Sequence, residues 1–200
     1  EGANSISVGA RSLAQSGSVA IGGDGGDLGT LGAQASGVDS TAVGADSEAS
    51  ATEASAFGNA ARATGDDSTA LGVDTLASGT RSTAVGNRAS ASGTDSVALG
   101  NLANADFAGS IAIGSSADVG GIDTVAIGTD ATAGAAEAIA MGTFASAGGI
   151  AAVSIGNNSA ANAENAIAIG DTSRAFSAGS VAIGGDGNDA DFVGAQATGN

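Results

Sequence analysis

Short segments in which apolar and small residues alternate recur along this chain at a fixed interval. A glycine follows a short apolar triplet throughout the sequence, and we call these residues the repeat glycines. From Gly44 to Gly184 they recur every 14 residues for ten consecutive steps. A period held so strictly predicts structural units that stack in register on their neighbours.

Each unit contains two segments that alternate with period two. Ser110-Ile111-Ala112-Ile113-Gly114 is typical of the first, and Ala131-Thr132-Ala133 is typical of the second. Period two is the period of a β-strand, and glycines suit the tight corners between such strands. The sequence therefore predicts an all-β fold, a parallel β-roll with two short strands in each 14-residue coil.

The two segments present different faces. The middle residue of Ala-x-Ala is often polar, as at Glu48 and Arg62, which predicts that it faces solvent. In the other segment both faces are apolar. We expect the large residues, such as Val97, Leu99 and Phe57, to form the core against the Ala-x-Ala strand.

The opposite face of that segment carries only small residues, which predicts close contact with another copy of the chain. A monomer with small exposed residues is the alternative. The predicted interface row is Ala42, Ala56, Ala70, Ala84, Ala98, Ala112, Ala126, Ala140, Ser154, Ala168 and Ala182.

The composition argues against several classes of function. The chain has no His, Cys or Tyr, and all five basic residues are Arg, so the usual general acids, bases and nucleophiles are missing. We expect no catalytic residues and no cofactor. The net charge of −16 argues against nucleic acid and against an anionic membrane surface. No apolar run is long enough to span a bilayer.

The 14-residue period is interrupted once, and the sequence motif found at the interruption occurs again near the end of the chain. The interval from Gly22 to Gly44 begins with Gly-Gly-Asp-Gly, and the same motif follows Gly184. We interpret residues 1–200 as a single array with inserted coils near 22–44 and 184–200, the second cut within a coil, and expect it to be a piece of a longer protein. The motif resembles the opening of calcium-binding nonapeptides, although isolated copies favour a flexible acidic turn. The candidate ligands are Asp24, Asp27, Asp186 and Asp189.

Acidic residues recur five positions before the repeat glycines, and stacking would align them on one edge. Arg81 is the only basic residue in this slot, and we expect it to lie between Asp67 and Asp95. A solvated edge is favoured over a cation site. The acidic row is Asp39, Glu53, Asp67, Asp95, Asp123 and Glu137.

Four apolar residues fall in slots that the period places in turns or on the outside. Exposed aromatic side chains can anchor a protein partner, although singly exposed apolar residues are also ordinary. The candidate partner-binding residues are Leu76, Leu102, Phe144 and Phe176.

The motif Ser-Val-Ala-Ile-Gly, followed by Ala-x-Ala on a 14-residue period, resembles the YadA-like head domains of trimeric autotransporter adhesins over nearly the whole chain. The resemblance implies a left-handed parallel β-roll, a homotrimer about a common axis, and display on the bacterial cell surface through a stalk and an outer-membrane anchor outside this sequence. It also implies attachment to host matrix proteins, host cells or other bacteria. A passive spacer remains the alternative, whereas the variable middle residue of Ala-x-Ala disfavours an ice-binding surface.

Overall fold

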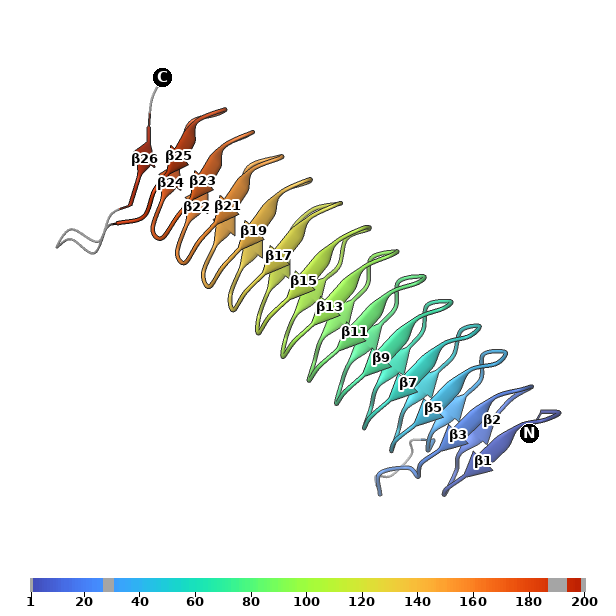
Figure 1. Cartoon of the computed structure of the whole chain (residues 1–200). Helices are drawn as coiled ribbons and strands as arrows, with labels where there is room; N and C mark the ends of the chain where they lie inside the picture. Colours follow the sequence, from blue (N-terminus) through green and yellow to red (C-terminus); the bar gives the residue numbers. More distant parts are fainter. Residues whose placement is uncertain (1, 27–30, 187–193, 199–200) are drawn as a thin grey trace. The chain divides into compact units, whose positions relative to one another are not determined.

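The computed structural model describes residues 2–26, 31–186 and 194–198, and these residues form strands and turns without any helix (Figure 1). The prediction of an all-β, parallel stacked solenoid is confirmed. The chain divides into two compact units, Glu1–Leu102 and Ala103–Asn200, and the same coil repeats in both. Within the described ranges no helix is long and apolar enough to cross a membrane.

In the first unit each coil contributes one strand to each of two parallel sheets. The three-residue strands are β1 (Ile6–Val8), β3 (Val19–Ile21), β5 (Thr41–Val43), β7 (Ser55–Phe57), β9 (Thr69–Leu71), β11 (Thr83–Val85) and β13 (Val97–Leu99). The two-residue strands are β2 (Leu13–Ala14), β4 (Gln34–Ala35), β6 (Glu48–Ala49), β8 (Arg62–Ala63), β10 (Leu76–Ala77) and β12 (Ser90–Ala91).

The second unit has the same construction. Its three-residue strands are β15 (Ile111–Ile113), β17 (Val125–Ile127), β19 (Ile139–Met141), β21 (Val153–Ile155), β23 (Ile167–Ile169) and β25 (Val181–Ile183). Its two-residue strands are β14 (Asn104–Ala105), β16 (Asp118–Val119), β18 (Thr132–Ala133), β20 (Ser146–Ala147), β22 (Ala160–Ala161), β24 (Arg174–Ala175) and β26 (Gln196–Ala197).

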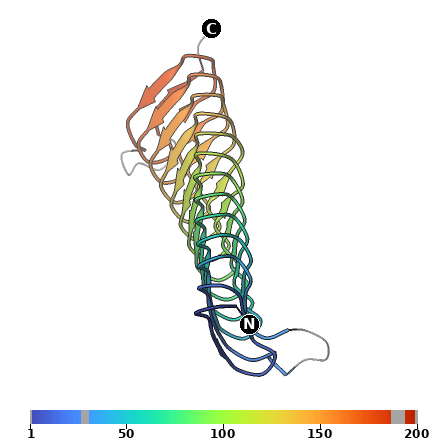
Figure 2. The ribbon, with the colours of Figure 1, turned by 90° about the vertical axis from the view of Figure 1, so that its right-hand side faces the viewer.

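Strands pair with the equivalent strand of the next coil. Ala112 on β15 lies opposite Ala126 on β17, and Ala133 on β18 lies opposite Ala147 on β20. Equivalent residues of successive coils therefore stand in line, as the rigid period predicts. In Figure 2 the successive coils of each unit lie one behind the other.

Alanine and serine fill the interior of each coil. Ala112 and Ala126 from the three-residue strands are fully buried, as are Ala131 and Ala133 on the opposite side of the coil. Val119 is the only buried aliphatic side chain larger than alanine in the described part of the chain. The two sheets therefore lie close together, because only small side chains separate them.

This thin interior reverses the predicted faces of the three-residue strands. The small-residue row from Ala42 to Ala182 is buried inside its own coils, with exposed fractions of 0–3%. The prediction that this row contacts another copy is therefore wrong. Leu99 and Phe57, predicted as core, are 40% and 37% exposed on the outside. Large side chains have no room between sheets that are spaced by alanine, so they point outward.

The repeat glycines are required at one corner of each coil. Gly128 has a φ of 137°, and a Cβ atom there would lie 2.4 Å from the carbonyl oxygen of Gly142 in the next coil. A side chain would therefore meet both backbone strain and a clash with the adjacent coil. This stacking contact explains why the glycine keeps its place in every coil.

The two insertions lengthen a corner of the roll, which corrects the prediction of inserted coils. The amide of Ala33 donates to the carbonyl of Gly22 (3.2 Å), and the amide of Ala195 donates to the carbonyl of Gly184 (3.1 Å). Each insertion thus leaves and rejoins the coil at the repeat glycine. The flanking strands still pair directly, β3 with β5 and β24 with β26, so the stack is not interrupted.

Candidate interaction surfaces

The described residues enclose no pocket, so any site must lie on the outer surface of the coils. They also contain no group of three acidic side chains placed to hold a metal ion. The carboxylate of the candidate ligand Asp24 accepts a hydrogen bond from the amide of Gly26 (3.3 Å) and lies 3.5 Å from Nη1 of Arg11. Asp27 and Asp189 lie outside the described residues, and Asp186 is at their border.

The outward side chains of the three-residue strands form a continuous surface in each unit, which we call the apolar face. It carries no charged residue, and several of its side chains are substantially exposed, such as Leu71 (47%) and Met141 (38%). In the first unit the face is Ile6, Val8, Val19, Ile21, Thr41, Val43, Ser55, Phe57, Thr69, Leu71, Thr83, Val85, Val97 and Leu99. In the second unit it is Ile111, Ile113, Val125, Ile127, Ile139, Met141, Val153, Ile155, Ile167, Ile169, Val181 and Ile183.

The outward side chains of the two-residue strands form a second surface, which we call the polar face. Its residues differ from coil to coil, and some pair with the equivalent residue of the next coil. Nε of Arg62 lies 3.2 Å from Oε2 of Glu48, and Nδ2 of Asn104 donates to Oδ1 of Asp118 (2.9 Å). This face agrees with the prediction that the middle residue of Ala-x-Ala faces solvent.

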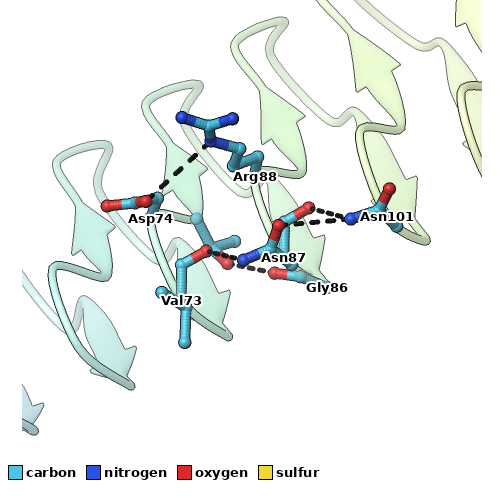
Figure 3. A network of polar contacts seen from close by, with 7 residues as sticks. Val73, Asp74, Gly86, Asn87, Arg88 and Asn101 are labelled. Carbon is cyan, nitrogen blue, oxygen red and sulfur yellow. Dashed lines mark hydrogen bonds and ion pairs between the residues drawn. The ribbon is translucent and has the colours of Figure 1, made fainter.

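The corner after each repeat glycine carries a second set of contacts between coils (Figure 3). Nδ2 of Asn101 donates to the backbone carbonyl and to Oδ1 of Asn87, at 3.4 and 3.2 Å. Nδ2 of Asn87 in turn reaches the carbonyl of Val73 (3.5 Å), and Nε of Arg88 lies 3.9 Å from Oδ2 of Asp74. These side chains extend the hydrogen-bonded stacking beyond the strands.

Arg81 contacts the acidic row as predicted, but on one side only. Its Nε and Nη2 atoms donate to the two carboxylate oxygens of Asp95 at 2.6 and 2.7 Å. The hydrogen bond from Arg81 lowers the pKa of Asp95, and the same bond raises the pKa of Arg81. Asp67 acts on Arg81 only through its charge, which adds to the rise in that pKa.

The acidic row has a conformational origin. Asp39, Asp67, Asp95 and Asp123 all have φ between 54° and 58°, the left-handed region that Asp and Asn enter more readily than most residues. A turn requirement therefore accounts for these carboxylates without a bound ion.

The four candidate partner-binding residues do not form one cluster. Leu102 and Phe144 occupy left-handed corners, with φ of 57° and 56°, and their side chains are 48% and 56% exposed. Phe176 is 45% exposed directly after β24, and Leu76 is half-buried on the polar face. Their slots differ, since Phe144 comes two residues after a repeat glycine and Phe176 comes six residues after one.

Sequence reasoning missed Arg174 as a candidate contact residue. Arg174 points outward from β24, two residues before Phe176, and has no acidic partner among the described residues. The sequence could have indicated this, because the neighbouring coils place the uncharged residues Ala160 and Gln196 in the slot of Arg174. Arg174 therefore has no acidic residue beside it in that slot. The other arginines each have an acidic partner within 4 Å; the pairs are Arg11–Asp24, Arg62–Glu48, Arg81–Asp95 and Arg88–Asp74.

The stacked coils and their motif can be compared with known families. The family described as YadA head domain repeat (2 copies) matches residues 35–61, 63–89, 91–117, 120–145, 147–173 and 161–186. These segments cover more than half of the chain. The chain belongs to the YadA head domain family. The resemblance noted in the sequence is thereby confirmed.

A solved structure of similar sequence is the collagen-binding domain of the Yersinia adhesin YadA. It is 28% identical to this YadA-type chain, and the alignment covers 86% of this chain and 83% of that domain, with a TM-score of 0.49. No curated protein sequence matches the chain.

Proposed function

We propose that this chain is the non-enzymatic head of a bacterial surface adhesin, held at the cell surface by parts outside this sequence. Membership of the YadA head domain family is the observation that carries the proposal. The architecture supports it, because the coils that the structure describes offer an outer surface and enclose no cleft for a small substrate. The partner class is a host matrix protein, a host-cell surface protein or another bacterium.

The proposed adhesive surface lies on the polar face and the corners. These positions vary between coils while the interior stays the same, so they can change without disturbing the stack. Among exposed side chains, phenylalanine and arginine are of the types enriched in protein interfaces, and leucine adds apolar contact area. The proposed contact residues are Leu76, Leu102, Phe144 and Phe176, to which the structure adds Arg174.

We also propose that the chain is a homotrimer whose copies meet through the apolar face. Two copies that each carry a net charge of −16 repel one another, and the apolar face is a surface where they can approach without bringing charges together. Covering the exposed Val, Ile and Leu side chains would remove apolar surface from water. The number three comes from the family resemblance. This interface replaces the small-residue row of the sequence prediction.

A binding screen tests the adhesin function. The purified chain would be presented to immobilised collagen, fibronectin and laminin and to whole cells. The anchor variant carries Leu76→Ser, Leu102→Asn, Phe144→Asn and Phe176→Thr, each of which uses a residue that the chain itself places in that slot at Ser90, Asn158 or Thr64. We expect the parent to bind at least one surface and the anchor variant to lose that binding at an unchanged melting temperature.

The matched control changes the same kinds of slot at other coils, with Ser116→Asn at a corner and Ala160→Ser on the polar face. It should bind like the parent. A passive spacer is the second candidate function, favoured by the scattering of the four exposed apolar residues over different slots. A parent that binds none of the surfaces would support the spacer and contradict the adhesin.

A further inference from the structure

The apolar face changes chemistry along the chain. In the second unit its first row, three residues before each repeat glycine, consists entirely of valine and isoleucine, from Ile111 to Val181. In the first unit the same row carries hydroxyl side chains in four consecutive coils, Thr41, Ser55, Thr69 and Thr83, which we call the hydroxyl band. These residues pair in register, so their side chains follow one another in line.

The corner that precedes these strands changes in the same direction. Ile122 and Ile150 are 52% and 54% exposed in the second unit, three residues before the first outward residue of their strands. The same slot in the four coils of the hydroxyl band holds Val38, which is 54% exposed, and then Thr52, Asp66 and Thr80. Apart from Glu164, this slot is apolar throughout the second unit, whereas three of the four coils of the hydroxyl band hold Thr or Asp there.

The two halves of the face must behave differently when they are covered. Valine and isoleucine gain stability simply by leaving water. A hydroxyl loses its hydrogen bonds to water and needs a new partner, or must keep a water molecule in the interface. Copies aligned in register bring the hydroxyl band of one chain against the hydroxyl band of the next, so these groups share a common hydrated strip.

We propose that copies of this chain are held together mainly by the second unit's part of the apolar face, and that the hydroxyl band is a hydrated strip where the assembly opens first. This rests on the proposed assembly through the apolar face. The occupant of the face is a second copy of the chain, because the face carries no charge and the rest of this acidic chain would repel a copy elsewhere.

Two matched pairs of substitutions test the proposal, since valine and threonine have nearly the same shape. Val125→Thr with Val153→Thr transfers the hydroxyl chemistry to the second unit. Thr69→Val with Thr83→Val removes it from the first. Sedimentation across a guanidinium titration would measure dissociation, and circular dichroism of the dilute chain would check that each single copy stays folded.

We expect the first pair to raise the fraction of dissociated chains by about tenfold at a fixed denaturant concentration. The second pair should lower it. Hydrogen exchange of the parent should be faster in the strands of residues 41–85 than in those of residues 111–155.

The possible outcomes separate this inference from the proposed function. A parent that sediments as a single chain at every concentration overturns both the proposed assembly through the apolar face and the hydrated strip. An assembled parent in which both pairs weaken association equally, or in which both segments exchange at the same rate, overturns only the hydrated strip. A loss of association on Thr69→Val with Thr83→Val would show that the hydroxyls bond directly across copies, which also contradicts it.

Discussion

The hydroxyl groups of Ser154 and Ser159 meet inside one coil, with their Oγ atoms 2.7 Å apart. Ser154 replaces the usual alanine of its row, and Ser159 faces it from the other side of the interior. Both side chains are buried, with exposed fractions of 0% and 1%. The serine that replaces alanine at position 154 is thus accompanied by a hydroxyl partner at the facing position, as buried polar groups generally are.

Removing one partner should cost more than removing both. Ser159→Ala leaves the buried hydroxyl of Ser154 without its partner and should destabilise the chain by about 1–3 kcal/mol. The double variant Ser154→Ala with Ser159→Ala recreates the arrangement of Ala126 and Ala131 and should recover most of that loss. Thermal unfolding of the four members of the cycle measures the coupling. Additive effects would contradict the pairing.

The pair of Arg81 and Asp95 should contribute a small stabilisation that depends on salt and pH. Arg81→Ala should lower the melting temperature by at most about 2 °C, because exposed ion pairs are screened by solvent. The pKa of folded Asp95 lies below its ordinary value of 3.8. The stabilisation is therefore present above pH 3.8 and is lost as the pH falls through the lower folded value.

Melting curves of the parent and Arg81→Ala should consequently converge at low pH and in molar salt. Arg62→Ala, which removes another exposed pair, serves as a comparison for general loss of charge. A difference that persisted in molar salt would mean that Arg81 stabilises the corner by packing.

Substitution by alanine should distinguish a glycine that lies against the next coil from a glycine that has room for a side chain. Gly128→Ala places a Cβ atom 2.4 Å from the carbonyl oxygen of Gly142 and forces alanine to a φ of 137°. The backbone conformation alone should cost about 1–3 kcal/mol. At Gly134 the nearest atom would be 3.7 Å away, so Gly134→Ala should change stability by less than about 0.5 kcal/mol. Equal melting temperatures for the two variants would mean that adjacent coils separate easily.

Enlarging the buried alanine row should damage the fold of each chain. Ala112→Leu adds three carbon atoms between the two sheets and should cost about 1–3 kcal/mol or more, independently of protein concentration. Thr132→Leu makes a comparable change on the polar face and should be tolerated. Circular dichroism melts at two dilutions decide between the interior and an interface. A loss of stability that appeared only on dilution would mean that Ala112 lies in a contact between copies.

The period of the sequence was sufficient to predict the coil, the two parallel strands and the register, because equivalent residues of successive strands must pair in line. It was not sufficient to decide which face of a strand lies inside. Alternation places Ala112 on one side and Ile111 and Ile113 on the other, and either side could be the interior. The deciding quantity is the distance between the two sheets, which the facing residues Ala117 and Val119 set through tertiary packing.

The candidate contact residues were predictable only in part. The exposure of Phe144 and Phe176 follows from their slots, and the contact of Arg81 with Asp95 follows from the 14-residue spacing. The left-handed corner of Asp95 was missed, because aspartate was interpreted through its charge and not through its backbone preference. That Arg174 has no acidic partner among the described residues could be anticipated only by comparing one slot across neighbouring coils.

The direct pairing of β3 with β5 across an insertion has a consequence for how such chains diverge. A coil that meets its neighbours through the same small interior is an exchangeable module, and extra residues at the corner after Gly22 leave the stack intact. Coils can be duplicated, deleted or exchanged between related genes without redesign of a core. The length of the molecule and the chemistry that it displays can therefore evolve independently of each other.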